Sequence, residues 1–556
     1  MRAELPLSIP ERSTCSPLAV DCKASRTKRI SGLVIAFGVL TAATIAHAQD
    51  MLPVQNSVYH DISTPLGKIK AEVNQTKGKR RENVVHRLTI VETKGPQKDP
   101  LVQLTAVAAL PVLAETSEGL GQGLKYDSNV TPSDATGAVG TNYFVEWVND
   151  AVLVINKNTH EPVYGPADGR TIWANFAPKD NPAHACAETN DGDPIVLYDH
   201  IENRWFLSQF SHKGGPPYLQ CIAVSRSSDP LGTYARYAYQ FADFNDYGKF
   251  AIWPDGYYAG FNMYESTAKD SPGKGGQSCA FDRISMLAGK EARMVCFRLP
   301  QAGLLPSDLD GQALPSNGAP NYFLSLGPSR LRYWKFHVDW SHPEHSTMSG
   351  PDDVSLVSSF VSACTVMTCE LIPQKGSDGT LDTMGDRLMY RLAYRKFKDH
   401  ESLVVNHAVR VPGRENSNIG VIAFRWYEIR PSANGLAVYQ SGTFRPSTIS
   451  RWMGSMAMDK AGNIAIGYNA SSSTDYPSIY YTGRIASQPD PNTLGQEYLL
   501  QSGSGSQSGH SWGDYTTMSV DPTDDCTFWF VSQYLKKGDA NLWHTTISRL
   551  RFQSCK

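Results

Sequence analysis

One strand-turn-strand unit returns along most of this 556-residue chain, and it constrains the fold more than any single motif. In residues 451–471, two apolar runs flank the sequence Asp-Lys-Ala-Gly-Asn. Asp459, Gly462 and Asn463 are residue types that readily adopt tight-turn dihedral angles. The segment therefore predicts a β-hairpin.

Comparable hairpins recur, and most of them end in a side-chain amide. The hairpin ends are Asn149, Gln209, Asn262, Ser325 (in place of an amide), Asn406, Asn469 and Gln533. Neighbouring ends lie 53 to 81 residues apart, and a third run that tends to close with a basic residue follows each hairpin. This period, built of three or four short strands, predicts an all-β, seven-bladed β-propeller of four-stranded blades. Two β-sandwiches with coincidentally spaced hairpins are the alternative, but sandwiches do not require one pattern to return seven times.

The repeats define the expected domains. We expect a signal peptide with a long n-region at residues 1–48, a polar N-terminal arm at 49–98, and the propeller at 99–556. The last blade supplies only three strands before the chain ends, so an earlier segment should complete it and remove the open edges. The apolar run 101–112 is the candidate for this closing strand.

The N-terminal region carries the pattern of an export signal. Four basic residues precede the apolar run 30–45, which ends in Ala-His-Ala at residues 46–48. This pattern predicts cleavage before Gln49. A transmembrane anchor is the alternative, although the run is short for one. We expect a secreted or periplasmic protein with no stable membrane span after cleavage.

Cysteine usage agrees with export. The mature chain keeps eight cysteines, an even number that suggests disulfides in an oxidising compartment. The blade register predicts sequential pairs: Cys186 with Cys221, Cys279 with Cys296, Cys364 with Cys369, and Cys526 with Cys555. A cysteine-zinc site is not indicated, because the chain has no CxxC pair and no histidine at ligand spacing from the cysteines.

Charge and motifs narrow the function classes. Lys and Arg total 52 against 54 Asp and Glu, so the chain lacks the basic excess of a general nucleic-acid binder. The sequence contains no HExxH, GxSxG or P-loop pattern, so zincin, α/β-hydrolase and phosphate-loop functions have no support.

Chemistry is expected where the blades meet. In a propeller the first strand of each blade lines the central channel, so the residues just before these strands should form a ring at its mouth. That ring comprises Asp134, Asp193, Lys249, Arg387, Arg451, Trp452, Trp512, Asp514 and Tyr515. The hairpin-end amides should lie on the same face.

Such a ring suits a carbohydrate, because it offers carboxylates, fixed cations, amides and aromatic plates. Asp134, Asp193 and Asp514 are the candidate catalytic residues, since paired carboxylates perform acid/base work on glycosidic bonds. The other ring residues are candidate binding residues. In the alternative, the charges neutralise one another and the amides cap turns.

No cofactor is required by this pattern. Calcium is the one ion the acidic turns suggest, at residues 191–193 or 521–525, where carboxylates cluster. The spacing matches no calcium-loop signature.

Several segments resemble a group of exported bacterial β-propeller proteins of unestablished role. The resemblance runs from about residue 129 to 552 and rests on NDGDPIVLYD, FAIWPDGYY, DRLMYRLAYR, RWMGSMAMDKAGNIAIGY and WGDYTTMSVDP, among others. It implies a propeller and export, and it brings no catalytic assignment. At a greater distance the layout is similar to sialidase-type propellers. Their repeated S-x-D-x-G-x-T-W turns are missing here, so no sialidase residue is carried over.

These observations predict an exported propeller that engages a carbohydrate or cell-surface glycan at its channel face, as a glycoside hydrolase or a polysaccharide lyase if it catalyses a reaction. The alternative is a non-catalytic surface-adhesion or protein-interaction propeller. We expect a monomer that does not bind nucleic acid.

Overall fold

The computed structural model describes residues 49–72, 81–82, 85–88, 98–107, 112–121, 130–355, 358–413, 420–537 and 542–556. The expected signal segment lies outside these residues. No helix in the described part of the chain is long and apolar enough to cross a membrane.

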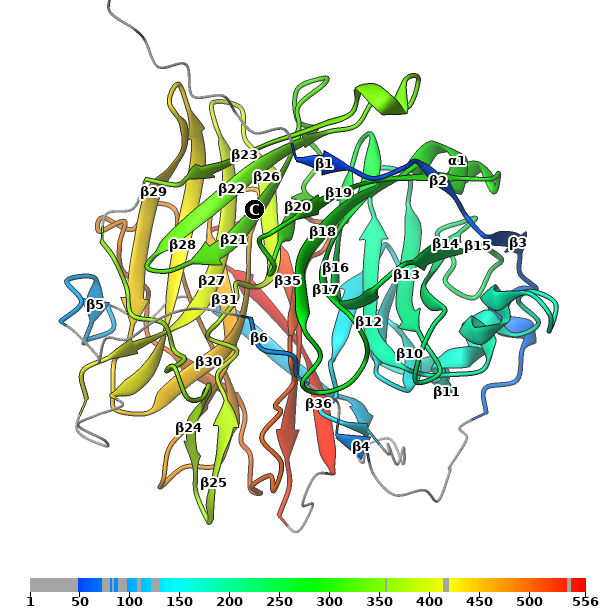
Figure 1. Ribbon diagram of the computed structural model, residues 1–556. Helices are drawn as coiled ribbons and strands as arrows, with labels where there is room; N and C mark the ends of the chain where they lie inside the picture. The colour runs from blue at the N-terminus through cyan, green and yellow to red at the C-terminus, as the bar shows by residue number, and fades with distance from the viewer. Residues whose placement is uncertain are drawn as a thin grey trace, which may run out of the picture. The chain divides into compact units, whose positions relative to one another are not determined.

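The described chain is mostly β-strand, arranged as antiparallel meanders of consecutive strands (Figure 1). The first two meanders are β8 (Thr136–Val139), β9 (Tyr143–Val148), β10 (Ala151–Asn156) and β11 (Pro162–Asp168), then β12 (Gly192–Asp199), β13 (Arg204–Ser211), β14 (Tyr218–Ser225) and β15 (Tyr234–Phe241). The next is β16 (Phe244–Trp253), β17 (Gly256–Tyr264), β18 (Gly273–Phe281) and β19 (Arg293–Leu299).

Two further meanders merge into one sheet. The strands are β20 (Leu305–Asp310), β21 (Asn321–Gly327), β22 (Arg330–His337) and β23 (Thr347–Asp353), and β26 (Met389–Lys396), β27 (Glu401–Val411), β28 (Val421–Ser432) and β29 (Gly435–Phe444). They join through parallel pairing of β20 with β26, with Ser307 opposite Leu392.

The C-terminal strands form the remaining meanders. These are β30 (Ser450–Met458), β31 (Ile464–Ser471), β32 (Ser478–Arg484) and β33 (Tyr498–Gln501), and β34 (Thr517–Val520), β35 (Thr527–Leu535) and β36 (Trp543–Phe552). Two small ribbons pair β24 (Glu370–Gln374) with β25 (Ser377–Asp382), and β4 (Arg81–Glu82) with β7 (Val130–Thr131). Helices are short: α1 (Arg283–Ala288), η1 (Leu66–Lys68), η3 (Gly169–Trp173), η4 (Pro182–Ala187) and η5 (Pro343–His345).

The hairpin expected at residues 451–471 is β30 and β31. Asp459 Oδ1 accepts hydrogen bonds from the backbone N–H groups of Ala461 and Asn463, both at 2.9 Å. Gly462 takes the left-handed conformation that the turn requires (φ 81°). The predicted turn residues thus act through the expected chemistry.

The strand that completes the C-terminal sheet is β6 (Val112–Gly121), which pairs antiparallel with β36 (Figure 1). The prediction that residues 101–112 would do so was wrong. In that run β5 (Val102–Gln103) instead pairs with β29. Apolar content misled the prediction, because β6 is an outer strand and residues 114–116 are exposed.

The N-terminal arm adds edge strands to two sheets. β1 (Asp50–Met51) and β2 (Gln55–Asn56) pair with β19, and β3 (Tyr59–Ile62) pairs with β15. Arg236 on β15 anchors the arm by binding Asp61 through two hydrogen bonds of 2.8 and 2.7 Å.

The four predicted disulfides are all present, in the predicted pairing. Cys279 lies directly opposite Cys296 on β18 and β19, and Cys186 in η4 joins Cys221 on β14. Cys364 joins Cys369 across a small loop, and Cys526 in the β34–β35 turn joins Cys555 after β36. Four disulfides indicate an oxidising, extracytoplasmic location.

A buried carboxyl group joins the first and last sheets. Glu146 on β9 accepts hydrogen bonds from Leu120 N on β6 (2.8 Å) and Thr545 Oγ1 on β36 (2.5 Å). Burial raises the pKa of Glu146 to about 7, although both hydrogen bonds favour the ionised form.

We expect Glu146→Gln to stabilise the protein at alkaline pH and to be nearly neutral at pH 4. Below the ordinary glutamate pKa the carboxyl group is protonated in both states. Between the ordinary glutamate pKa and about 7 the unfolded state is ionised while the folded state stays protonated, so the folded wild type loses about 3 kcal/mol of stability as the pH rises across this window. Glutamine removes this cost: its oxygen accepts from Leu120 N, and its NH2 group donates to Thr545 Oγ1, whose hydroxyl then donates to Leu120 O. Urea unfolding at pH 4 and pH 8 measures the difference, and an equal effect at both pH values would contradict the buried charge.

Candidate functional site

A left-handed residue stands at or just before the inner strand of each meander. These residues are Asp134, Asp193, Tyr247, Gly303, Met384, Met453 and Asp514, with φ between 47° and 68°. For a residue other than glycine this conformation costs about 1–2 kcal/mol. Such strain gathers at functional sites, where the surrounding structure over-determines it.

The hairpin-end amides hold these turns in place across the boundaries between sheets. Asn149 Oδ1 accepts from Asp193 N (3.2 Å), and Asn262 Oδ1 accepts from Gly303 N (2.8 Å). Gln533 Oε1 accepts from both Ser133 N (3.0 Å) and Ser133 Oγ (2.7 Å). These three amides therefore cap turns, as in the alternative interpretation of the sequence.

Gln209 differs from the other amides. Its side chain is fully buried, and neither its oxygen nor its nitrogen makes a hydrogen bond to another described residue. Buried polar atoms are usually paired, so Gln209 is an exception, with neither side-chain polar atom bonded.

The structure brings five of the predicted ring residues together. Asp134, Asp193, Lys249, Asp514 and Tyr515 gather with Tyr247, which the sequence did not single out, and we call this cluster the hub. Lys249 Nζ lies 4.0 Å from Asp193 Oδ2, and 3.5 and 3.7 Å from the ring centroids of Tyr247 and Tyr515. A desolvated ammonium group between two aromatic faces is a favourable cation–π arrangement.

The pKa values in this cluster are strongly displaced. Burial, together with the charges of Asp514 and Asp193, raises the pKa of Asp134 well above its usual range. Burial likewise raises the pKa of Asp193 to about 6, against the opposing effect of Lys249. Burial lowers the pKa of Lys249 to about 8. Asp514 also has a strongly raised pKa, because of burial and the neighbouring Asp193 and Asp382.

A cavity of about 180 Å³ opens beside the cluster. It is lined by Val85, His86, Asp191, Asp193, Phe210, His212, Phe244, Asp246, Tyr247, Thr267, Met384, Arg387 and Asp514. Asp193, Asp514 and Arg387 are the predicted ring residues that reach it. Asp134 lies behind, fully buried, with its Oδ2 accepting from Asn149 Nδ2 at 2.8 Å.

Three predicted ring residues do not take part. Arg451 pairs with Glu497 at 2.6 Å, away from the cavity. Trp452 and Trp512 are fully buried and pack against each other with ring centroids 6.1 Å apart, so neither presents a face to a ligand. The sequence pattern shows which residues precede each strand, but it does not show which of their side chains a neighbouring sheet buries.

The segment Val85–Leu88 of the N-terminal arm lies beside this cavity, a placement that the sequence did not predict. His86 Nδ1 lies 3.2 Å from Asp246 Oδ2, and the His86 ring stacks on Tyr264 at 4.2 Å. Its carbonyl oxygen accepts from Arg387 Nη2 at 2.7 Å, and Leu88 N donates to Asp386 Oδ2 at 2.8 Å. Burial opposes protonation of His86, but the hydrogen bond and charge of Asp246 hold its pKa above the ordinary value.

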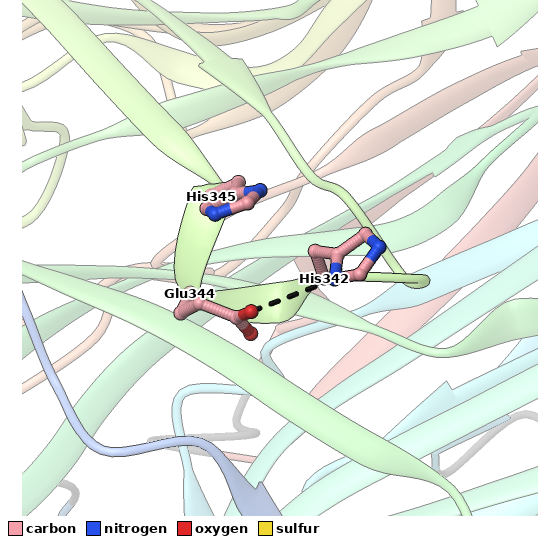
Figure 2. A group of neighbouring side chains, drawn as sticks. All are labelled: His342, Glu344 and His345. Atoms are coloured by element: carbon pink, nitrogen blue, oxygen red, sulfur yellow. Dashed lines mark ion pairs between the residues drawn. The ribbon is translucent and has the colours of Figure 1, made fainter.

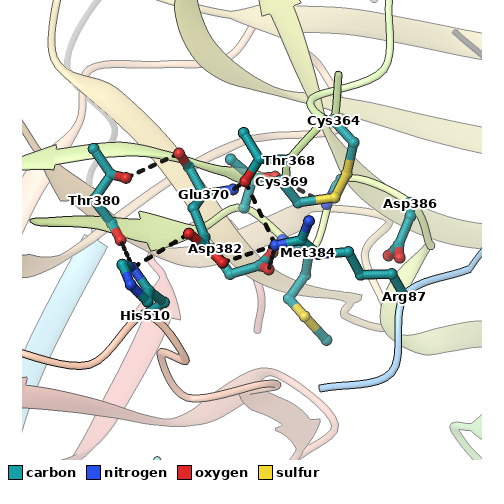
Figure 3. A network of polar contacts seen from close by, with 12 residues as sticks. Arg87, Cys364, Thr368, Cys369, Glu370, Thr380, Asp382, Met384, Asp386 and His510 are labelled. Atoms are coloured by element: carbon teal, nitrogen blue, oxygen red, sulfur yellow. Dashed lines mark hydrogen bonds and ion pairs between the residues drawn. A yellow bond between two sulfur atoms is a disulfide. The ribbon is translucent and has the colours of Figure 1, made fainter. Parts of the chain in front are cut away.

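Arg87 anchors the same segment on its outer side. Arg87 Nη2 pairs with Glu370 Oε1 at 2.8 Å, and His510 approaches the other Glu370 oxygen at 3.5 Å (Figure 3). The Cys364–Cys369 disulfide lies beside this network (Figure 3). We call residues Val85–Leu88 the strap.

The strap separates two hollows. Val85 and His86 line the 180 Å³ cavity, whereas Arg87 and Leu88 line a second one of about 410 Å³ with Asp386, Tyr264 and Gln301. Arg387 and Asp386, which are neighbours in sequence, likewise line one cavity each, so the strap and this pair lie between the two cavities.

The acidic turns suggested for calcium are occupied by protein donors. Asp191 Oδ2 accepts from His212 N and Lys213 N at 2.7 and 3.1 Å. In the other turn, Asp521 Oδ1 binds Lys157 Nζ at 2.9 Å and Asp525 pairs with Arg395 at 2.6 Å.

Comparison with known proteins yields fold likeness only. No family model matches the chain, and no curated protein matches it. Solved structures with distant similarity include the N-terminal domain of Nup159, at 8% identity and a TM-score of 0.33 over 85% of this chain and 99% of that one. The WD40 domain of SCAP from fission yeast is 8% identical, with a TM-score of 0.30 over 74% of this chain and 82% of that one. Trypanosoma rangeli sialidase is 9% identical, with a TM-score of 0.30 over 64% of this chain and 54% of that one. These neighbours are propeller-like, the similarity is too low to carry a functional argument, and no family is assigned.

We expect Lys249→Met to destabilise the protein more at pH 8 than at pH 5. Methionine keeps the apolar stem but removes the cation that offsets Asp193, so the pKa of Asp193 rises further. Above pH 6 the variant must then either keep Asp193 protonated or bury an uncompensated carboxylate, and the latter costs about 3–5 kcal/mol. Below pH 5 Asp193 is protonated, and most of this loss disappears.

Urea unfolding of Lys249→Met and of Lys249→Met with Asp193→Asn tests the pair. The double variant should recover most of the stability lost at pH 8. If it stays as unstable as the single variant, Asp193 is not the partner of Lys249.

Proposed function

We propose that the chain is an exported, seven-bladed β-propeller whose last blade is completed by β6. The inner strands contact one another in the order β8, β12, β16, β20, β26, β30, β34 and again β8, which supports a closed ring. The amide bonds between sheets support the same arrangement. Four disulfides and the signal-like N-terminal segment support export.

We propose further that the propeller binds a carbohydrate at the hub. The observation that carries the proposal is the cavity that collects Asp193, Asp246, Asp514 and Arg387 from separate sheets beside aromatic rings. Carboxylates and a guanidinium group bind sugar hydroxyl and carboxylate groups, and Phe210 and Phe244 supply apolar surface for a ring face. The strained turns and displaced pKa values fit a functional site rather than a purely structural one.

In this proposal Asp193 is the acid/base group. A carboxyl group with a pKa of about 6 is protonated often enough near neutral pH to give a proton to a leaving oxygen, and to take one back. Asp514 is the second carboxyl group in the same cavity, as glycoside cleavage requires. Asp134 lies behind them, and burial together with the charges of Asp514 and Asp193 raises its own pKa.

The strap would regulate access. By itself the 180 Å³ cavity is smaller than the roughly 300–1,000 Å³ of common ligand pockets, but it shares the strap with the 410 Å³ cavity. Displacement of the strap would join the two hollows into a groove of ligand size, with Arg387 and Asp386 released toward it.

The second candidate function is non-catalytic adhesion. The strap over the hub and the buried Trp452 and Trp512 favour it, because they leave little sugar-binding surface exposed in this state. Binding without turnover would support this function.

A panel of polysaccharides tests the proposal with the mature protein, by measuring affinity and the release of new reducing ends. We expect Asp193→Asn to abolish turnover and Asp514→Asn to weaken binding or turnover at least tenfold. Asp353→Asn on β23, which pairs with Arg330 at the surface, is the matched control and should behave as wild type. Unchanged binding and turnover in both hub variants, in folded protein, would refute the site.

The strap makes a separate prediction. Combining His86→Ala with Leu88→Ala removes the contacts with Asp246 and Tyr264 and should strengthen glycan binding about tenfold, because less free energy is needed to open the groove. The control is His60→Ala with Ile62→Ala, on β3 of the same arm but outside the hub.

Hydrogen exchange provides the direct readout. Saturating glycan should accelerate exchange of the Leu88 amide, which is bonded to Asp386 in the strapped state. Unchanged exchange together with unchanged affinity would show that the strap is a fixed part of the wall.

A further inference from the structure

A second cluster of metal-binding side chains lies away from the hub, in the loop between β22 and β23. His342, Glu344 and His345 each offer a ligand atom, and these atoms all lie within 4.8 Å of one another (Figure 2). Among the described residues this is the one group of three or more His, Cys, Asp or Glu side chains placed in this way. Sequence reasoning passed over it, because His-x-Glu-His at this spacing matches no common metal signature.

The loop is built to hold these side chains before any ion arrives. Asp339 Oδ1 accepts from the backbone N–H groups of Ser341 and His342, both at 2.9 Å. The turn of η5 brings His345 back over His342, with His345 N donating to His342 O at 2.8 Å. The two imidazole rings consequently stack at 5.3 Å.

The base of the loop is fixed to the neighbouring sheet. Trp340 Nε1 donates to Asp255 O at 2.6 Å, and Arg293 Nη2 on β19 donates to Trp340 O at 2.6 Å. Asp339 N donates to Ser346 Oγ at 3.0 Å, which closes the loop on itself. Binding an ion here would therefore require rotation of exposed side chains and little movement of the backbone.

The donor set selects the class of ion. Two imidazole nitrogens and one carboxylate suit Zn²⁺ and the other late first-row divalent ions, whereas Ca²⁺ and Mg²⁺ prefer oxygen ligands. His342 and Glu344 already lie 3.6 Å apart, and their side chains are 64% and 66% exposed, so an ion can reach them from solvent.

We propose that His342, Glu344 and His345 form a surface site for Zn²⁺, with water completing a tetrahedral coordination. Three protein ligands leave one position open, which is the arrangement of zinc sites that bind a further ligand or activate water. The site is independent of the carbohydrate proposed at the hub, and either can fail without the other.

Titration of tag-free mature protein with ZnCl₂, against a chromophoric zinc indicator, tests the site. We expect one zinc per chain, and a loss of affinity of at least tenfold in His342→Ala and in His345→Ala. Glu344→Gln should weaken binding less, because both imidazoles remain. A large excess of CaCl₂ should not displace the zinc, whereas NiCl₂ should.

His400→Ala is the matched control. His400 is a partly exposed histidine beside Asp399 and belongs to no such group of three potential ligands among the described residues, so its loss should leave zinc binding unchanged. X-ray absorption of the zinc-loaded protein should show nitrogen and oxygen ligands with the multiple scattering of two imidazoles. Unchanged affinity in the His342→Ala, His345→Ala double variant, or one zinc per two chains, would overturn the proposal.

Discussion

The contact on which the hub depends is a hydrogen bond between neighbouring sheets. An amide at the end of one sheet's second strand binds the left-handed turn that begins the next sheet's first strand, as Asn149 does with Asp193 and Asn262 with Gly303. Each bond satisfies a buried backbone N–H group, which would cost about 1–3 kcal/mol if left unpaired. The strained turns persist because the adjacent sheet holds them.

This arrangement explains why charge accumulates at the hub. A left-handed turn directs its side chain away from the strand ladder, and Asp tolerates that conformation better than most residues. Asp134, Asp193 and Asp514 occupy three such turns, and with little solvent around them their pKa values rise. Lys249 between two tyrosine rings limits the repulsion. Strain, burial and charge therefore coincide at these three turns, whereas Tyr247, Gly303, Met384 and Met453 repeat the backbone geometry without a charge.

The strap places the N-terminal arm in the same network. Arg387 binds both Asp386 and the carbonyl oxygen of His86, so this cation is shared between its own segment and one that lies 301 residues away in sequence. Any ligand that competes for Arg387 or Asp246 competes with the strap as well. Two of the side chains that hold the arm, Asp246 and Arg387, therefore also line the cavity.

The sequence by itself determined the elements whose signals are local. Turn residues such as Asp459 and Gly462 specified hairpins, and their recurrence predicted the all-β class, the four disulfide pairs and most of the hub cluster. Tertiary structure alone decided which residues reach the cavity. It buried Trp452 and Trp512 against each other, paired Arg451 with Glu497, and selected β6 rather than residues 101–112 as the completing strand. These outcomes depend on what the neighbouring sheet covers and on which strand edge is left unpaired, and neither is encoded in the periodicity of one segment.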